Sequence, residues 1–394
     1  MGSSDTRKRL TRSGGEGRPG GSTAACAAAT IHRMRTAVIS DLHLGAIGGA
    51  DLARRPDALE RLAAALEPAE RVVLLGDVIE TRERPLAAML EIVRPFFERL
   101  GAGAAGKRIT FVPGNHDHLL AEPWLARERL AGRPLESAHE WPVEPGERDG
   151  PAGRLASWLP GAEVTLAYPG LWLQPGVYAT HGHYLDLHLT VPRLESIAAS
   201  AMGRVTGRGR DCTSAADYEA VLAPLYGFYS ALAQGASTGV MERGARMSRT
   251  VWSRATGDGR AARLLLGGVT IPGAVLALNR LGLGPFKPEL TGEELRRAGL
   301  LSMGRVAEAL APGAEHVLFG HTHRPGPLAG DDEPEWTTLS GTRLWNSGSW
   351  YLEAAFVATM AERSPYWPGT IAWLEPDAPP RLENALRGYA AVSA

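Results

Sequence analysis

The chain has little cysteine, with only Cys26 and Cys212 among its 394 residues. Two thiols this far apart cannot form the disulfide framework of a small secreted protein. Neither has a cysteine or histidine neighbour at the spacing of a zinc site. We therefore expect a protein of the reducing cytoplasm.

The chain also lacks net charge, with 42 Lys and Arg against 43 Asp and Glu. Bulk charge therefore attracts neither nucleic acid nor an anionic membrane, and recognition of a charged ligand must be local. Long hydrophobic runs are missing too, because the most apolar stretch, 264–283, is interrupted by Pro272, Asn279 and Arg280. It falls short of the roughly 20 apolar residues of a spanning helix. Two interpretations stay open: a helix buried in its own core, or an apolar cap over a lipid-like substrate or a peripheral membrane anchor.

The first 33 residues are rich in Gly, Ser and Arg and show no apolar periodicity, which predicts disorder. A basic start before Ala24 to Ala29 only faintly resembles a signal peptide, because alanine with a cysteine makes a poor hydrophobic region. Met34 precedes the first predicted strand, so translation from Met1 and from Met34 both stay open. The remaining chain is globular in composition, at 44% hydrophobic residues.

Strands alternate with helices from residue 36 to about 112. This alternation predicts an α/β fold with a largely parallel sheet. Further on, Pro and Gly mark turns between three short strands, after a segment that we expect to be a surface loop. The predicted strands are 36–40, 72–75, 109–112, 163–167, 171–173 and 177–180, the helices 57–66 and 86–100, and the loop 140–161.

Residues 187–310 change to a helical pattern, and strand signals return afterwards. We therefore predict a domain over residues 34–390 that is interrupted by a helical insertion or cap over 187–310. Thr291 followed by Glu294 makes a capping box at the start of the last helix. The predicted helices are 215–232, 238–254, 261–281 and 291–310, and the returning strands are 317–319, 343–346, 351–359 and 370–374.

Five short polar clusters come where predicted strands end. In α/β sheets, ligands bind beyond the carboxyl ends of strands, so we expect the clusters to meet there. Carboxylates, an amide and imidazoles without any thiolate suit Mn, Fe, Zn or Mg. There are more donors than one metal takes, and two metals that share a carboxylate fit the count. The clusters are Ser40-Asp41-Leu42-His43, Gly76-Asp77, Gly114-Asn115-His116-Asp117, His181-Gly182-His183 and Gly320-His321-Thr322-His323.

Each cluster taken alone has an ordinary explanation. Asp41 or Asp77 in isolation is more often a cap of a helix or turn, and His181 an ordinary buried histidine. The joint occurrence of five clusters in order argues against that explanation.

In order and in local sequence, the five clusters resemble the calcineurin-like metallophosphoesterases over roughly residues 36–374, apart from the insertion. The resemblance implies a layered α/β fold with a central β-sandwich and a dinuclear metal site, with Mn the expected metal and Fe, Zn or Mg as alternatives. It also implies the ligands. One metal takes Asp41, His43, Asp77 and His323, and the other takes Asp77, Asn115, His181 and His321, with Asp77 bridging.

Two cations roughly 3.5–4 Å apart lower the pKa of a water between them and neutralise charge at phosphorus. We therefore expect hydrolysis of a phosphomonoester, phosphodiester or pyrophosphate by an activated hydroxide, with His116 as donor to the leaving oxygen. Asp117 either orients His116 or caps the following helix. His183 either supports a metal ligand or contacts the substrate phosphate, and Arg324 either contacts a phosphate or is a surface charge.

The residues after Asp77 bear on the substrate. Val78-Ile79-Glu80-Thr81-Arg82 stands where serine/threonine phosphatases have a valine-aspartate-arginine-glycine run, so protein phosphatase activity is not expected. The segment is more similar to the bacterial branch that includes UDP-2,3-diacylglucosamine pyrophosphohydrolases, whose inserted cap holds acyl chains. His181-Gly182-His183 departs from the His-Gly-Asp of that branch, and the insertion here is longer.

The partner is therefore expected to be a phosphorylated small molecule or lipid-like substrate, and the oligomeric state stays open. A nuclease is the alternative, because the insertion carries several arginines, although nucleic acid is not favoured as partner. A non-catalytic scaffold is a further alternative, and intact ligand positions argue against it. The arginines are Arg204, Arg208, Arg210, Arg243, Arg246, Arg249 and Arg254.

Overall fold

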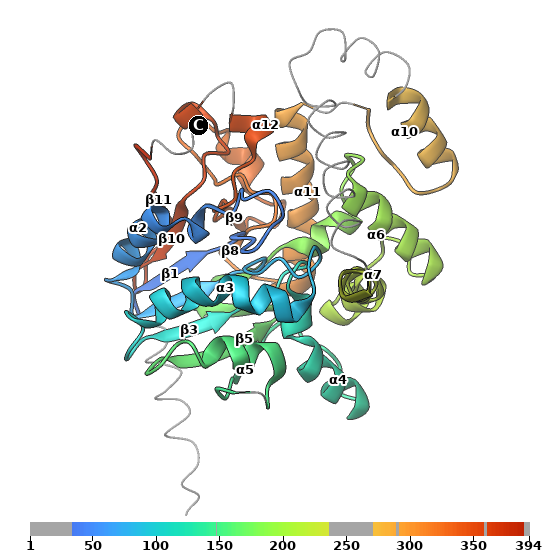
Figure 1. Ribbon diagram of the computed structural model, residues 1–394. Coiled ribbons are helices and arrows are strands. Elements are labelled where there is room, and N and C mark those ends of the chain that lie inside the picture. The colour runs from blue at the N-terminus through green and yellow to red at the C-terminus, as the bar shows by residue number, and fades with distance from the viewer. Residues whose placement is uncertain (1–33, 147, 236–270, 289–290, 358–360, 390–394) are drawn as a thin grey trace, which may run out of the picture.

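Two β-sheets stack face to face at the centre of the protein (Figure 1). The computed structural model describes residues 34–146, 148–235, 271–288, 291–357 and 361–389. The larger sheet has seven strands in the order β11-β10-β1-β2-β3-β5-β4. Four are parallel neighbours: β1 (Thr36–Ile39), β2 (Arg71–Leu74), β3 (Arg108–Phe111) and β5 (Glu163–Tyr168). The antiparallel strands at its edges are β4 (His139–Pro142), β10 (Thr370–Leu374) and β11 (Arg381–Asn384).

The smaller sheet has four strands in the order β6-β7-β8-β9. Its parallel strands are β7 (Val177–Thr180), β8 (His316–Phe319) and β9 (Arg343–Asn346), with β6 (Gly170–Gln174) antiparallel at one edge. The strand ends at 180 and 319 therefore point the same way, which brings two of the polar clusters to one edge of this sheet.

Alternation along the strands explains the layers. In β1, Val38 faces the other sheet, whereas Ala37 and Ile39 face the outer helices. The inner faces bury one apolar layer, so the sheets form a β-sandwich. This layer consists of Val38, Val73, Leu75, Val112, Ala167, Leu171, Leu173, Val177, Ala179, Leu318, Ala372 and Leu374.

Helices cover both outer faces, which gives a four-layered α/β fold and confirms the predicted fold class. The seven-stranded sheet packs against α2 (Pro56–Leu66), α3 (Leu86–Gly101), α4 (Glu122–Leu130) and α5 (Gly150–Ala156). The four-stranded sheet packs against α6 (Leu194–Val205), α7 (Ala215–Gly235) and α11 (Gly292–Leu310). Short helices lie between these elements: η1 (Leu52–Arg54), η2 (His118–Leu120), η3 (His183–Leu187), η5 (Glu333–Trp336), η6 (Ala361–Arg363) and α12 (Ala354–Val357).

The last helix of the predicted insertion belongs to the central packing. α11 follows the N-cap Thr291, whose side chain accepts a hydrogen bond from the Glu294 backbone N–H at 3.1 Å, which is one of the two bonds of the predicted capping box. Its buried residues Met303 and Val306 pack in one cluster with Phe319 of β8. α11 is therefore the crossover helix that leads into β8, and the boundary of the insertion remains a prediction.

Two predicted segments are wrong. The predicted surface loop 140–161 contains β4, which pairs with β5, and α5, whose Leu155 is fully buried. Pro151 does not break α5, because a proline is tolerated in the first turn of a helix. The predicted strand 351–359 has α12 over Ala354–Val357, and residues 358–360 lie outside the described part. There the sequence Ala-Ala-Phe-Val carries no alternating pattern.

Several predictions fall outside the described residues: the disordered segment 1–33, the helix 238–254 and the first part of the helix 261–281. The apolar stretch 264–283 is described only from residue 271, where α10 (Ile271–Arg280) forms. Val275 of this helix is buried, whereas Leu276 is exposed. Among the helices of the described ranges, none is long and apolar enough to span a bilayer.

Candidate metal centre

The five polar clusters meet at one edge of the sandwich. Asp41 and His43 follow β1, and Asp77 follows β2. Asn115 follows β3 of the same sheet. His181 follows β7 of the other sheet, and His321 and His323 follow β8. The candidate centre thus takes side chains from both sheets.

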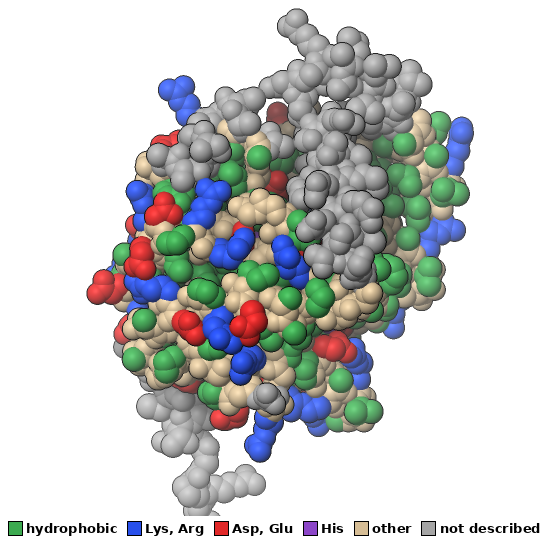
Figure 2. Space-filling view, viewed as in Figure 1, with side chains coloured by type: hydrophobic (Ala, Val, Ile, Leu, Met, Phe, Trp, Pro, Cys, Tyr) green, Lys and Arg blue, Asp and Glu red, His purple; other side chains and the backbone are tan. Residues whose placement is uncertain are grey.

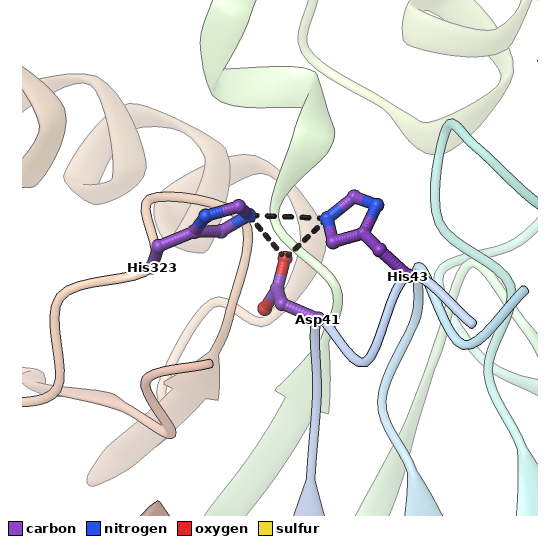
Figure 3. Close-up of side chains that lie close together, drawn as sticks. All are labelled: Asp41, His43 and His323. Carbon is purple, nitrogen blue, oxygen red and sulfur yellow. Dashed lines mark hydrogen bonds and ion pairs between the residues drawn. The ribbon is translucent and has the colours of Figure 1, made fainter. Parts of the chain in front are cut away.

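Asp41, His43 and His323 form the first ligand group (Figure 3). Asp41 Oδ1 lies 3.3 Å from His323 Nε2 and 3.9 Å from His43 Nε2, and the two Nε2 atoms are 3.1 Å apart. A transition-metal cation binds such atoms at about 2.0–2.2 Å, which places its ligands about 3–3.5 Å from one another. The three atoms therefore fit one cation.

Asp77, His181 and His321 form the second ligand group. Asp77 Oδ2 lies 3.2 Å from His181 Nε2. Asn115 Oδ1 is buried and has no hydrogen-bond partner among the described residues. His181 Nε2 and His321 Nε2 are buried too and make no aligned hydrogen bond there, although carboxylate oxygens of Asp77 and Asp186 lie 3.2 and 3.1 Å from them. Buried polar atoms without a hydrogen bond are costly, and a bound cation would supply an interaction for all three.

One carboxylate oxygen serves both groups. Asp77 Oδ2 lies 3.8 Å from His43 Nε2 in addition to its contact with His181. Asp77 Oδ1 instead accepts a hydrogen bond from the His116 backbone N–H at 2.8 Å, which fixes the carboxylate. The site can therefore hold two divalent cations bridged by Asp77.

The ligand histidines are oriented through their other ring nitrogen. His323 Nδ1 lies 2.9 Å from Glu353 Oε1, and His181 Nδ1 lies 3.0 Å from the Leu75 carbonyl. His43 Nδ1 lies 3.3 Å from Glu80 Oε2. Acceptors at Nδ1 place the proton there and leave the Nε2 lone pair for a metal, as in known metal sites.

The backbone at the ligands is strained. Six non-glycine residues of the described part have positive φ, and five of them are candidate ligands. These are Asp41 (53°), His43 (44°), Asp77 (50°), His321 (64°) and His323 (61°). The left-handed region is unfavourable for residues with a Cβ, and such outliers gather at functional sites.

Motif glycines leave room for the ligands. A Cβ on Gly114 would collide with the Asp77 carboxylate and the His181 ring. A Cβ on Gly320 would collide with Asp41 and Ser40. Glycine at these positions lets the backbone approach the ligand side chains closely.

Charges at the centre are strongly coupled. Burial alone raises the pKa of Asp41 and Asp77, but the histidines around them outweigh burial and hold both pKa values below their usual range. Burial lowers the pKa of His181, yet Asp77 and Asp41 raise it to about 9. His323, which is also buried, is raised to about 10 by Asp41 and Glu353. The buried carboxylates thus require positive charge, from histidine protons or from bound cations.

His116 also lies within reach of the first group, close to His43 and Asp77. Both of its ring nitrogens are already occupied. Nδ1 lies 2.5 Å from Glu80 Oε2, and Nε2 accepts a hydrogen bond from Arg82 Nη1 at 3.0 Å. Burial lowers the pKa of His116, with Glu80 opposing and Arg82 adding to this effect. His116 Nε2 therefore lies beside the ligand groups, 3.9 Å from Asp77 Oδ2, with both ring nitrogens engaged by Glu80 and Arg82.

Asp117 has neither of the two roles expected for it. Its carboxylate accepts hydrogen bonds from the backbone N–H groups of Val78 and Gly114, both at 2.7 Å, and from Asp77 N at 3.2 Å. It makes no side-chain cap of the following helix η2 and is not hydrogen-bonded to the His116 side chain. Burial and the charge of Asp77 raise its pKa to about 6. Asp117 fastens two ligand loops to each other.

The two candidate substrate contacts have different surroundings. His183 is buried among Tyr168, Tyr184 and Tyr226, and neither ring nitrogen has a partner in the described ranges. Arg324 lines a cavity beside His323, and its guanidinium binds Asp331 with 2.5 and 3.0 Å contacts. Their roles toward a substrate remain predictions.

The structure adds partners that the motifs do not contain. Glu80 contacts both His43 and His116, Arg82 contacts His116, and Glu353 contacts His323. Asp186 Oδ2 lies 3.1 Å from His321 Nε2. Glu80 and Arg82 lie in the segment where the sequence departs from the serine/threonine phosphatases, and that departure is the sequence feature that could have pointed to them. No sequence pattern points to Glu353.

One comparison with known proteins, the family match, agrees with the geometry. The model of a family described as calcineurin-like phosphoesterase matches residues 34–205. None of the curated proteins matches the chain. A solved structure of a dimetal phosphatase from Danio rerio is similar at 15% identity and a TM-score of 0.33, covering 89% of this chain and 98% of that chain. At that TM-score the likeness supports no conclusion about this chain.

Proposed function

We propose that this protein, whose residues 34–205 match the calcineurin-like phosphoesterase family, cleaves a phosphomonoester, phosphodiester or pyrophosphate bond with two divalent cations, manganese first among them. The family match supports a metal-dependent hydrolase of phosphoric esters. The choice of bond and of metal is our proposal. Its main support is Asp77 Oδ2, which faces both ligand groups and so allows one carboxylate to bridge two cations.

Bound to these ligands, the two cations supply an activated water and neutralise charge on the phosphoryl oxygens. The chain supplies the rest. Asp77 and Asp41 hold the centre, and His116 delivers a proton to the leaving oxygen. In the described state His116 carries its ring proton on Nδ1, toward Glu80, and its Nε2 accepts a hydrogen bond from Arg82. Nε2 can therefore donate only after it has taken up a second proton from solvent, which requires Arg82 to turn from it toward the substrate. Arg82 then offsets the charge that develops on the phosphoryl group.

A phosphorylated small molecule or a lipid-like compound is the substrate class we favour. The cavity beside His323 combines arginines with aromatic rings, including Arg193, Arg324, Phe356 and Tyr366. Such a lining suits a substrate with a charged group next to an apolar one. Flotation with phospholipid vesicles tests the membrane contact proposed for 264–283, and protein that stays in the soluble fraction argues against it.

The test of the reaction uses metal removal. Chelated protein should be inactive on an aryl phosphodiester and an aryl phosphomonoester, and Mn²⁺ should restore turnover. Asp77→Asn should abolish turnover and reduce metal content, because the bridging oxygen is lost. Undiminished turnover by metal-free protein would contradict the proposal.

A nuclease has less support. Of the arginines that motivate it, Arg208 pairs with Asp217 at 2.6 Å and Arg204 donates to the Leu281 carbonyl at 2.6 Å. Residues 243–254 lie outside the described part. Figure 2 shows Lys and Arg interspersed with Asp and Glu over the helices of the seven-stranded sheet, without a continuous basic groove on that face. Salt-sensitive turnover of single-stranded DNA would reverse this preference.

A further inference from the structure

Helix α7, in the predicted insertion, reaches the loop that follows Asp77. The Tyr229 ring lies under the Arg82 guanidinium, with Arg82 Cζ 4.1 Å from the ring centroid. One turn further on, Gln234 Oε1 accepts a hydrogen bond from the Leu86 backbone N–H at 3.1 Å. The C-terminal half of α7 therefore contacts both ends of the 82–86 segment.

The N-terminal half of α7 is anchored to the domain independently. The buried carboxylate of Glu219 lies 2.8 Å from His118 Nε2 and accepts hydrogen bonds from the hydroxyls of Tyr168 at 2.7 Å and Tyr184 at 3.0 Å. Glu219 and Tyr229 are ten residues apart on one helix, a rise of about 15 Å. Anchoring at Glu219 therefore fixes where Tyr229 stands.

Arg82 connects Tyr229 to His116. Its Nη1 donates to His116 Nε2 at 3.0 Å, and its backbone N–H donates to Glu80 Oε1 at 3.0 Å. The other Glu80 oxygen holds His116 Nδ1 at 2.5 Å. Glu80 and Arg82 thus each hydrogen-bond one ring nitrogen of His116, and together they favour the tautomer with the proton on Nδ1.

We propose that Tyr229 is a positioning residue of the hydrolase. Its ring holds the Arg82 guanidinium by a cation–π contact, and Arg82 in turn sets the tautomer and orientation of His116. The inference rests on the proposed function, and it goes further by assigning to the insertion a role in catalysis besides covering the site. An aromatic ring attracts a guanidinium through its negative face, and the contact strengthens when water is excluded.

The test compares variants of two neighbours on α7. Tyr229→Leu removes the aromatic ring but keeps an apolar residue that favours the helix. Tyr229→Phe keeps the ring and loses only the hydroxyl. Phe228→Leu is the matched control, because Phe228 is 61% exposed on the same helix and its ring, 5.9 Å from the Tyr229 ring between centroids, is not the ring on which Arg82 lies.

With Mn²⁺ and a phenyl phosphodiester, whose leaving group needs a proton, Tyr229→Leu should lower kcat about 10-fold or more, with KM changed less than threefold, since misplacing a reacting group is costly. Tyr229→Phe should stay within about threefold of the wild type. A kcat of Tyr229→Leu that matches that of Phe228→Leu would overturn the proposal.

A second measurement needs neither metal nor turnover. Long-range ¹H–¹⁵N correlation spectra of the metal-free protein report the tautomer of each histidine, and a His116→Asn spectrum assigns His116. The wild type, Tyr229→Phe and Phe228→Leu should show His116 with its proton on Nδ1, whereas Tyr229→Leu should show averaging between tautomers. An unchanged His116 signal in Tyr229→Leu would refute the positioning role. If the wild type proved inactive with metal, the proposed function would fail, and this spectrum would still decide the role of Tyr229.

Discussion

Replacing His116 by Asn distinguishes the two roles that its location allows, metal ligand and proton donor. The side chain lies close enough to His43 and Asp77 to be a ligand, yet Glu80 and Arg82 already occupy its two ring nitrogens. A nitrogen that accepts a hydrogen bond has no lone pair left for a cation. We therefore expect His116→Asn to retain two equivalents of Mn²⁺ per chain and to lose turnover.

The size of the loss follows from the role of a proton donor. General acid catalysis contributes about 10²- to 10⁴-fold, which corresponds to about 3–5 kcal/mol of transition-state stabilisation. A donor matters more for a basic leaving group than for an acidic one. The variant should therefore approach the larger loss on an alkyl or phenyl ester and lose much less on a p-nitrophenyl ester, where the leaving group departs without a proton.

The assay measures metal by plasma mass spectrometry and kcat on the three leaving groups. His43→Ala is the reference for ligand loss and should bind less metal. Loss of one metal equivalent in His116→Asn would refute the argument from its occupied nitrogens. An equal loss of kcat on all three esters would show that His116 does not protonate the leaving oxygen.

Three further predictions concern stability. Burial, aided by Arg305 and Arg210, lowers the pKa of His188 from 6.5 to about 4. Below about pH 6.5 only the unfolded chain takes up this proton, so stability falls toward acid. Between about pH 7.5 and about pH 5, urea unfolding should show a loss of about 2 kcal/mol that His188→Gln lacks, and equal losses would contradict the assignment. His323 has a φ of 61°, which glycine adopts without strain and alanine does not. In the presence of a chelator, the free energy of unfolding of His323→Gly should therefore be about 1 kcal/mol higher than that of His323→Ala. The reverse order would argue against backbone strain. Glu219→Gln should lower the free energy of unfolding by about 3 kcal/mol, since a buried ion pair is broken, and an unchanged midpoint would exclude Glu219 as the anchor of α7.

The sequence was sufficient for the strands that carry the site. Runs such as Val72–Leu75 are β-branched and continuous, as buried parallel strands are, and the structure has β2 within one residue of that range. The clusters could be placed because parallel strands deliver their carboxyl ends to one edge. That argument requires only the order of strand and cluster, both visible in a single chain.

Partners chosen by tertiary packing could not be predicted. Glu353 meets His323 and Tyr229 meets Arg82 across long chain separations, and a lone glutamate or tyrosine carries no periodic signal. Asp117 was misinterpreted for a related reason. Its position before a helix suggested a cap, whereas three backbone N–H groups of the ligand loops compete for the same carboxylate and win.

The origin of the ligands from both sheets has a mechanical consequence. His43 and His323 follow strands of opposite sheets, 280 positions apart along the chain. A cation held by both would act as a cross-link of that length, which removes about 5.6 kcal/mol of chain entropy from the unfolded state by the relation used for disulfides. The chain has only two cysteines, and Cys212 is a buried free thiol. A cation bound at this centre would stabilise the sandwich as a disulfide stabilises a secreted β-sandwich, and removing it with a chelator should lower the free energy of unfolding as reduction does there.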